Sequence, residues 1–197
     1  GGSVNGTDLT SAGTKLEEVG VITISPDGSA DVESVALEDL QDADQTVAGR
    51  AAAIQKQIDD AYGTVFAKTE VDLDGETEHV RSRETNLGNL VADALAWGAR
   101  EAGEPVDAAV INGGSIRASI PQGNITKKTI RTVLPFGNTL SIVKITGAEL
   151  LEALEASTYC TPSPMGSFPQ VFGIAFSVDT DAAYDPGAEY PNTYYHA

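Results

Sequence analysis

The sequence predicts an α/β layered domain that is preceded by a short β-rich segment. Helical and strand-like patterns alternate along the chain from residue 47 onward, which is typical of layered α/β domains. Before that point, residues 17–25 alternate between apolar and polar side chains, and a turn signal follows at residues 26–29. The chain has 197 residues, of which 41% are hydrophobic, enough for one sizeable core or for one domain plus part of another.

Four segments carry the apolar spacing or the end signals of a helix. They are residues 46–63, 84–103, 125–138 and 146–157. In the clearest of these, residues 84–103, either Thr85 or Asn86 can cap the first turn. Residues 125–138 are expected to form a short helix that Pro135 stops.

Strands are predicted where short apolar or alternating runs are bounded by turn residues. They are residues 17–25, 30–37, 64–73, 106–112, 139–146 and 171–180. Residues 1–15 and 74–80 are polar or glycine-rich and are expected to be loops. A domain boundary is predicted near residues 40–46, which are acidic and aperiodic, so the helix at 46–63 could connect two domains.

The chain is strongly acidic, with 29 Asp and Glu residues against 12 Lys and Arg and a net charge of -17. Such a surface repels phosphate backbones and anionic lipids, so binding to nucleic acid or to a membrane surface is disfavoured. Since no run approaches the ~18 apolar residues of a spanning helix, no membrane span is expected in this chain. The acidity fits a secreted or surface protein, and equally a salt-adapted one.

The sequence shows no recognisable motif for a metal site or for a catalytic nucleophile. The motifs of phosphate-binding loops, nucleophile elbows and zinc sites are missing. A two-metal hydrolytic site needs several His and Asp or Glu ligands, whereas His79 and His196 are the only histidines. Both are expected at the surface, and Cys160 is expected to behave as a small apolar side chain.

Two arginines lie directly before the predicted helix at residues 84–103. Arg81 and Arg83 precede a helix N-terminus, which attracts anions, and arginine binds phosphate or carboxylate through two parallel hydrogen bonds. The alternative is that these arginines are solvated and pair with Glu84 or Glu78. Sequence spacing alone leaves both interpretations open.

A glycine turn follows the predicted buried strand at residues 106–112. Ligands of open α/β sheets sit at the carboxyl ends of strands, and glycines allow the backbone to approach a ligand closely. Asn112 can donate and accept hydrogen bonds, and Arg117 can hold an anion. The alternative is an ordinary turn with a surface arginine.

One aromatic residue stands at a comparable segment end. Phe136 lies between Pro135 and Gly137, where its ring could stack on a flat ligand. Packing of Phe136 in the hydrophobic core is the alternative.

Four motifs occur in a fixed order and together point to a known family. They are "RSRETNLGNLVADAL", "AVINGGSIRASIPQGNIT", "LPFGNTLSIVKITGAELLEALE" and "GSFPQVFGIAFSVD". From about Arg81 to Asp179 the chain resembles the C-terminal, substrate-binding domain of the 5′-nucleotidase family, which has UDP-sugar hydrolases and 2′,3′-cyclic phosphodiesterases as relatives. Residues 1–45 resemble the closing strands of that family's metallophosphoesterase domain, and residues 46–63 resemble the linking helix.

The resemblance implies that residues 64–197 form a mixed layered α/β domain of the 5′-nucleotidase C-terminal type, and that this domain is truncated. The last strands of a metallophosphoesterase sandwich would precede it. Family members hydrolyse nucleoside phosphates with a divalent metal pair held by the N-terminal domain. The C-terminal domain grips the nucleoside. By resemblance, the substrate-binding residues are Arg81, Asn112, Gly113, Gly114, Arg117, Phe136 and Asn138, with Arg83 as a further candidate.

The sequence departs from the family pattern in several places. The metal-binding motifs are absent from these residues, so the metal pair would be held by the N-terminal catalytic domain in cis, and this chain alone is expected to be inactive. The family's second motif, with another stacking ring and a ribose-binding aspartate, is also not found, and Phe172 and Phe176 do not replace it. Ser115 stands where many relatives have a third glycine.

The expected function is therefore the nucleotide-binding portion of a secreted, periplasmic or cell-surface bacterial phosphohydrolase. The alternative is a non-catalytic module that binds nucleosides or nucleotides. A third interpretation, an interaction domain with a degenerate pocket, is disfavoured because Arg81, Asn112, Arg117 and Phe136 occur together.

Overall fold

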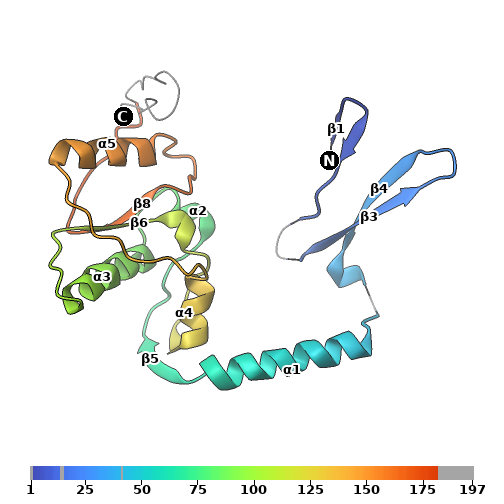
Figure 1. Cartoon of the computed structure of the whole chain (residues 1–197), viewed down its shortest axis with the longest axis horizontal. Coiled ribbons are helices and arrows are strands. Elements are labelled where there is room, and N and C mark those ends of the chain that lie inside the picture. The colour runs from blue at the N-terminus through green and yellow to red at the C-terminus, as the bar shows by residue number, and fades with distance from the viewer. Residues whose placement is uncertain (1, 14–15, 41, 182–197) are drawn as a thin grey trace. The chain divides into compact units, whose positions relative to one another are not determined.

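The chain divides into two compact units between Gln57 and Ile58 (Figure 1). The structure is a computed structural model, and it describes residues 2–13, 16–40 and 42–181. The division falls inside the long helix α1 (Gln45–Tyr62). The domain limits expected from the sequence, at residues 45 and 63, stay a prediction.

Two antiparallel β-hairpins precede helix α1 in the N-terminal unit (Figure 1). The first joins β1 (Gly2–Val4) to β2 (Thr7–Leu9), and the second joins β3 (Glu18–Ile24) to β4 (Ala30–Ala36). A short 3-10 turn, η1 (Leu37–Asp39), follows β4. The predicted strands at residues 17–25 and 30–37 are confirmed.

The prediction of a loop at residues 1–15 was wrong, because residues 2–9 form the first hairpin. Asn5 and Gly6 make its turn with φ angles of 53° and 76°. Asn and Gly adopt this left-handed region more readily than other residues, and Asn-Gly is a strong hairpin signal. The loop prediction followed from the polar, glycine-rich composition of residues 1–15 and overlooked this Asn-Gly pair.

Helix α1 confirms the helix expected at residues 46–63. Asp44 caps its start, because the carboxylate accepts hydrogen bonds from the backbone N–H groups of Thr46 at 2.8 Å and Val47 at 3.0 Å. These bonds lower the pKa of Asp44. Gly63 follows the last residue of the helix.

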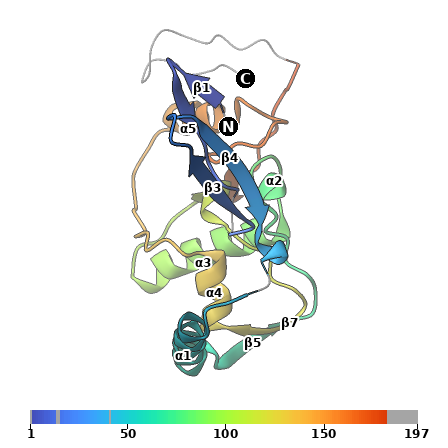
Figure 2. The ribbon, with the colours of Figure 1, turned by 90° about the vertical axis from the view of Figure 1, so that its right-hand side faces the viewer.

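Two pairs of antiparallel strands organise the C-terminal unit. They are β5 (Val65–Thr69) with β7 (Gly123–Thr126), and β6 (Ala109–Asn112) with β8 (Pro169–Phe172). Figure 2 shows β5 and β7 side by side. Each pair joins segments that lie more than 50 residues apart in sequence, so both depend on long-range contacts. Strand β7 was not predicted. The strand expected at residues 171–180 was largely wrong, because β8 ends at Phe172 and residues 173–180 form no strand.

Helices complete the C-terminal unit, which confirms the expected α/β class. They are α2 (Thr77–Val80), α3 (Asn86–Glu101), α4 (Lys127–Val133) and α5 (Gly147–Thr158), with the 3-10 turn η2 (Gly113–Ser115). Helix α3 packs against β6 and β8, and α5 contacts β8 (Figure 1). Helix α2 lies in a segment that was expected to be a loop.

The hydrophobic core gathers apolar side chains from α2, α3, α4, β7 and the segment after η2. Its members are Leu73, Val80, Leu87, Val91, Ile116, Ile120, Ile125 and Val133. Two of these residues are also paired through their backbones. The N–H of Leu73 donates to Ile120 O at 2.8 Å, and the N–H of Ile120 donates to Leu73 O at 2.9 Å. Two core residues, Val80 and Ile116, directly precede Arg81 and Arg117 in the chain.

Two expectations about strands were wrong. Residues 139–146 form no strand, and Ile142 and Val143 are 47% and 72% exposed. A strand needs a hydrogen-bonding partner, and no strand in the described part of the chain pairs with this segment. Strand β6 is only half-buried, with Val110 48% exposed, because α3 packs against it while its other face is open.

Candidate substrate-binding site

The first part of the candidate site is the short loop between α2 and α3, which carries Arg81 and Arg83. His79 anchors it, since its carbonyl oxygen accepts hydrogen bonds from the N–H groups of Ser82 at 3.1 Å and Arg83 at 3.0 Å. Arg81 is half-buried, and its Nε is fully buried without a hydrogen-bond partner among the described residues. A buried guanidinium N–H without an acceptor is costly, so the hydrogen bonding of Arg81 is incomplete in this arrangement.

An Asp–His pair supports the same loop from its N-terminal side. His79 Nδ1 lies 2.7 Å from Asp74 Oδ2. Burial raises the pKa of the Asp74 carboxyl, but hydrogen bonds from Glu76 N–H and His79, together with the charges of His79 and Arg83, lower it overall. Asp74 is therefore an anion that helps to hold this loop, and His79 is half-exposed, close to its expected place at the surface.

The glycine turn packs directly against this loop. A Cβ added to Gly113 would overlap the carbonyl oxygen of Val80, so only glycine fits there without a shift. The N–H of Gly113 donates to Phe168 O at 2.7 Å, and that of Gly114 donates to Gly166 O at 2.9 Å. The structure therefore brings the Arg81 loop and the glycine turn together, with the chain at residues 165–168 joining them.

The side chain of Asn112 is held at both ends of its amide. Its Nδ2 donates to Gly166 O at 3.0 Å, and its Oδ1 accepts from Ser115 Oγ at 2.6 Å. Ser115 is 7% exposed, so the residue that departs from the family pattern acts as a buried tether for Asn112. One amide hydrogen and one lone pair of Asn112 remain for another partner.

Arg117 and Phe136 come together although 19 residues separate them. The N–H of Arg117 donates to Val133 O at 2.9 Å, which places the residue beside the end of α4. The guanidinium carbon lies 5.9 Å from the centre of the Phe136 ring, within cation–π range. Phe136 is 53% exposed, so its ring is not part of the core.

Asn138 and Phe136 line a small cavity of about 110 Å³ next to the glycine turn. Its lining residues are Leu95, Ile111, Ser115, Leu134, Phe136 and Asn138. Ser115 is therefore shared between this cavity and the tether to Asn112. The lining combines apolar side chains with the polar Ser115 and Asn138, a mixture that is typical of small-molecule sites.

Gln170 is a residue of this site that the sequence did not single out. It is 1% exposed, and its side chain forms hydrogen bonds to three backbone groups of the loop that carries Arg81. Its one sequence signal is an amide within an otherwise apolar run, "PQVF". The three connected segments, residues 80–85, 112–117 and 165–170, are called the loop cluster below.

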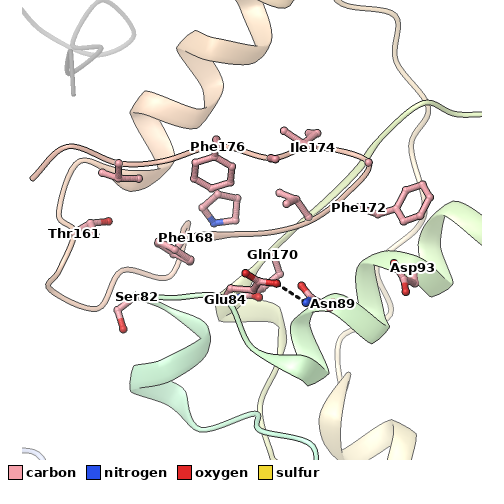
Figure 3. Close-up of a pocket in the computed structure, with 15 residues that line it drawn as sticks. Ser82, Glu84, Asn89, Asp93, Thr161, Phe168, Gln170, Phe172, Ile174 and Phe176 are labelled. Carbon is pink, nitrogen blue, oxygen red and sulfur yellow. Dashed lines mark hydrogen bonds between the residues drawn. The ribbon is translucent and has the colours of Figure 1, made fainter.

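A larger cavity of about 620 Å³ is lined by part of the loop cluster, including Ser82, Glu84 and Gln170, and by the chain after β8. Figure 3 shows that Glu84 and Asn89, joined by a hydrogen bond, face it from the start of α3, while Ile174 and Phe176 face it from the chain after β8. None of the predicted substrate-binding residues lines it. The predicted residues thus gather elsewhere, although this cavity is the larger one.

Within residues 2–13, 16–40 and 42–181, no group of three or more His, Cys, Asp or Glu side chains is placed to hold a metal ion. Cys160 is half-buried and unbridged, and His196 lies outside the described residues. None of the described helices is both long and apolar enough to cross a membrane.

The chain belongs to the 5′-nucleotidase family. Residues 65–189, more than half of the chain, match the family model described as "5'-nucleotidase, C-terminal domain". This match agrees with the expected family and with the expected C-terminal domain type, and the observed α/β architecture is consistent with both.

Relatives and a solved structure support the same assignment. The chain is 42% identical over 123 residues to the trifunctional nucleotide phosphoesterase protein YfkN of Bacillus subtilis, a match that covers 62% of this chain and 8% of that protein. It is 32% identical over 158 residues to a 5′-nucleotidase of Vibrio parahaemolyticus, with 80% and 27% covered.

The crystal structure of a 5′-nucleotidase precursor from Thermus thermophilus matches with a TM-score of 0.63 and 38% identity, covering 80% of this chain and 32% of that one. The chain therefore spans less than a third of the length of each of these three proteins.

Proposed function

We propose that this chain forms the nucleotide-binding part of a metal-dependent phosphohydrolase that converts nucleoside phosphates to nucleoside and phosphate. The observation that carries the proposal is the loop cluster, in which hydrogen bonds connect the segments of Arg81, Asn112 and Arg117, together with the exposed ring of Phe136 beside Arg117. Cations, an amide and an aromatic face on neighbouring loops are the groups needed to hold a phosphate, a sugar and a base.

Each side chain has a distinct role in this proposal. Arg81 and Arg117 hold and orient the phosphate and balance its charge. The ring of Phe136 stacks on the base, while Asn112 and Asn138 supply hydrogen bonds to the base or ribose. Arg83 is exposed and contributes to the local positive potential, which matters in a chain of net charge -17.

The chemistry of bond cleavage is proposed to come from a divalent metal pair. Such metals polarise a phosphate and generate a nucleophile from water. The described residues do not fit a metal centre, so the proposed ligands belong to a metallophosphoesterase domain in cis, of which residues 1–45 form the closing strands. The parent enzyme is proposed to be secreted, periplasmic or on the surface of a bacterium.

Calorimetric titration with adenosine and AMP tests the binding proposal. Phe136→Ala is expected to weaken the binding of both ligands by about 1–3 kcal/mol, the range measured for base–aromatic stacking. Leu140→Ala, which removes an exposed apolar side chain of the same region, is the matched control and should bind as wild type. Equal binding by wild type and Phe136→Ala would contradict the role of the ring.

The second candidate is a non-catalytic nucleoside-binding module that uses the same loop cluster and the ring of Phe136. Phosphate release from AMP with added Mn²⁺ separates the two. The chain of 197 residues should release none, whereas a longer chain that also carries a metallophosphoesterase domain should. Turnover by the 197-residue chain would contradict the proposed division of labour, and inactivity of the longer chain would favour the second candidate.

A further inference from the structure

We propose that Gln170 is a positioning residue that sets the orientation of Arg81 toward an anionic substrate group. This inference rests on the proposed function, and it assigns a role to a buried residue outside the set that resemblance implies. Gln170 lies on β8, opposite Ile111 of β6, and is 1% exposed.

The hydrogen bonds of Gln170 are used almost completely, and all go to one loop. Its Nε2 donates to Val80 O at 3.0 Å and to Arg83 O at 2.7 Å, while its Oε1 accepts from Thr85 N–H at 3.2 Å. Both donors of the amide are therefore engaged. A buried amide that is satisfied in this way costs little, but removal of its donors leaves two carbonyl groups without these partners.

These bonds act on the backbone on both sides of Arg81. The carbonyl of Val80 belongs to the peptide plane before Arg81, and Gln170 holds it. The carbonyl of Arg81 belongs to the next plane, and it accepts from Met165 N–H at 2.8 Å. Because two fixed peptide planes determine φ and ψ of the residue between them, the segment at 165–170 sets the direction in which the Cα–Cβ bond of Arg81 leaves the backbone.

The same segment also positions the second arginine loop. Phe168 O and Gly166 O accept hydrogen bonds from Gly113 and Gly114, at 2.7 and 2.9 Å. A single stretch of chain therefore sets the spacing between the loops of Arg81 and Arg117. A shift of about 1 Å in a substrate-holding group can cost orders of magnitude in rate, so such spacing has functional value.

The packing around Gln170 leaves little freedom for it to take another position. A Cβ added to Gly88 would overlap the Gln170 amide, so helix α3 approaches this side chain closely. Because the fit is close, the test substitutions should keep the length of the Gln170 side chain. Gln170→Met keeps its approximate shape and removes the polar bonds, and Gln170→Glu keeps its outline and one acceptor while it removes the donors.

The ratio of AMP affinity to adenosine affinity tests this proposal in the 197-residue chain. Adenosine lacks the phosphate that Arg81 is proposed to hold. Gln170→Met is expected to weaken AMP binding about tenfold and to leave adenosine binding within about twofold, since only the oriented arginine is affected. Gln122→Met is the matched control, because exposed Gln122 also tethers a loop, through Nε2 to Glu70 O at 2.8 Å, and should change neither affinity.

A second measurement separates positioning from general stability. Hydrogen exchange is expected to speed up in peptides covering residues 80–85 of Gln170→Met, while peptides from the later turns of α3 keep their protection. Equal loss of AMP and adenosine binding, or uniform loss of protection, would make Gln170 an ordinary core residue and overturn the proposal. If Gln170→Met does not fold, Gln170→Glu is measured in its place, and failure of both variants to fold also overturns the proposal.

Arg81→Gln distinguishes failure of this inference from failure of the proposed function. If Arg81→Gln loses the preference for AMP but the Gln170 variants keep it, only the positioning role is wrong. If Arg81→Gln binds AMP as wild type does, or if wild type binds neither ligand, the proposed binding function of this chain is wrong, and the positioning role fails with it.

Discussion

The loop cluster and the segment at residues 139–146 lie in the same unit, and in each the structure differs from what the local sequence suggests. The loop cluster is rich in glycine and polar residues, yet its three parts are connected by hydrogen bonds that Gln170 donates and that Phe168 O and Gly166 O accept. Residues 139–146 have the apolar pattern of a strand, yet they are exposed and form none. Order in this protein therefore follows long-range partners more closely than local propensity.

The largest expected effect breaks the loop cluster at its closest approach. Gly113→Ala places a Cβ on the carbonyl oxygen of Val80, and we expect a loss of about 3 kcal/mol in the free energy of unfolding. Urea denaturation followed by circular dichroism measures it. Gly98→Ala is the control, because nothing lies within 4 Å of that position in α3, and alanine there should stabilise by about 0.5–1 kcal/mol. A Gly113→Ala midpoint equal to that of wild type would show that the two loops can move apart freely.

An intermediate effect is expected at the boundary between the loop cluster and α3. Thr85 is 5% exposed, and its hydroxyl accepts a hydrogen bond from Gly88 N–H at 3.0 Å. Thr85→Ala should cost about 1 kcal/mol of stability, as loss of an N-cap usually does, whereas Thr85→Ser should keep the bond and most of the stability. Chemical denaturation compares the two. Equal losses would mean that the methyl group, and not the cap, accounts for the stability.

The smallest effect is expected in the strand-like segment. Ile142→Val removes a methylene from a side chain that is 47% exposed and should change stability by less than about 0.5 kcal/mol. Ile120→Val makes the same change at a core position that is 2% exposed and should cost about 1 kcal/mol. Thermal denaturation of both variants sharpens the comparison. A cost at Ile142 that matches the cost at Ile120 would show that the segment is packed, against the structure.

The fold was predictable where the signals are local. Helices α1, α3 and α5 lie close to their expected limits, because a capping residue and a periodic apolar face both act within a few residues. In α5, Thr146 and Glu149 form the reciprocal capping box that their spacing allows. Strand β7 and helix α2 were missed, since one is a short partner strand and the other a single turn in a polar segment.

The candidate site was predictable in its members but not in its construction. The resemblance named Arg81, Asn112, Arg117 and Phe136, and the structure shows how neighbouring segments hold them; their roles in binding stay a prediction. Gln170 was out of reach, because a glutamine in a strand has no pattern that reveals three long-range hydrogen bonds.

The sequence by itself determined the family, the α/β class, the helix starts and the scarcity of histidine, because each depends on residue identity and short spacing. Only the tertiary structure decided that Gly113 must be glycine, that Ser115 tethers Asn112, and that residues 139–146 are not a strand. Those outcomes depend on which backbone groups meet across more distant parts of the chain. A hydrogen bond or a steric overlap exists only once both partners are in place.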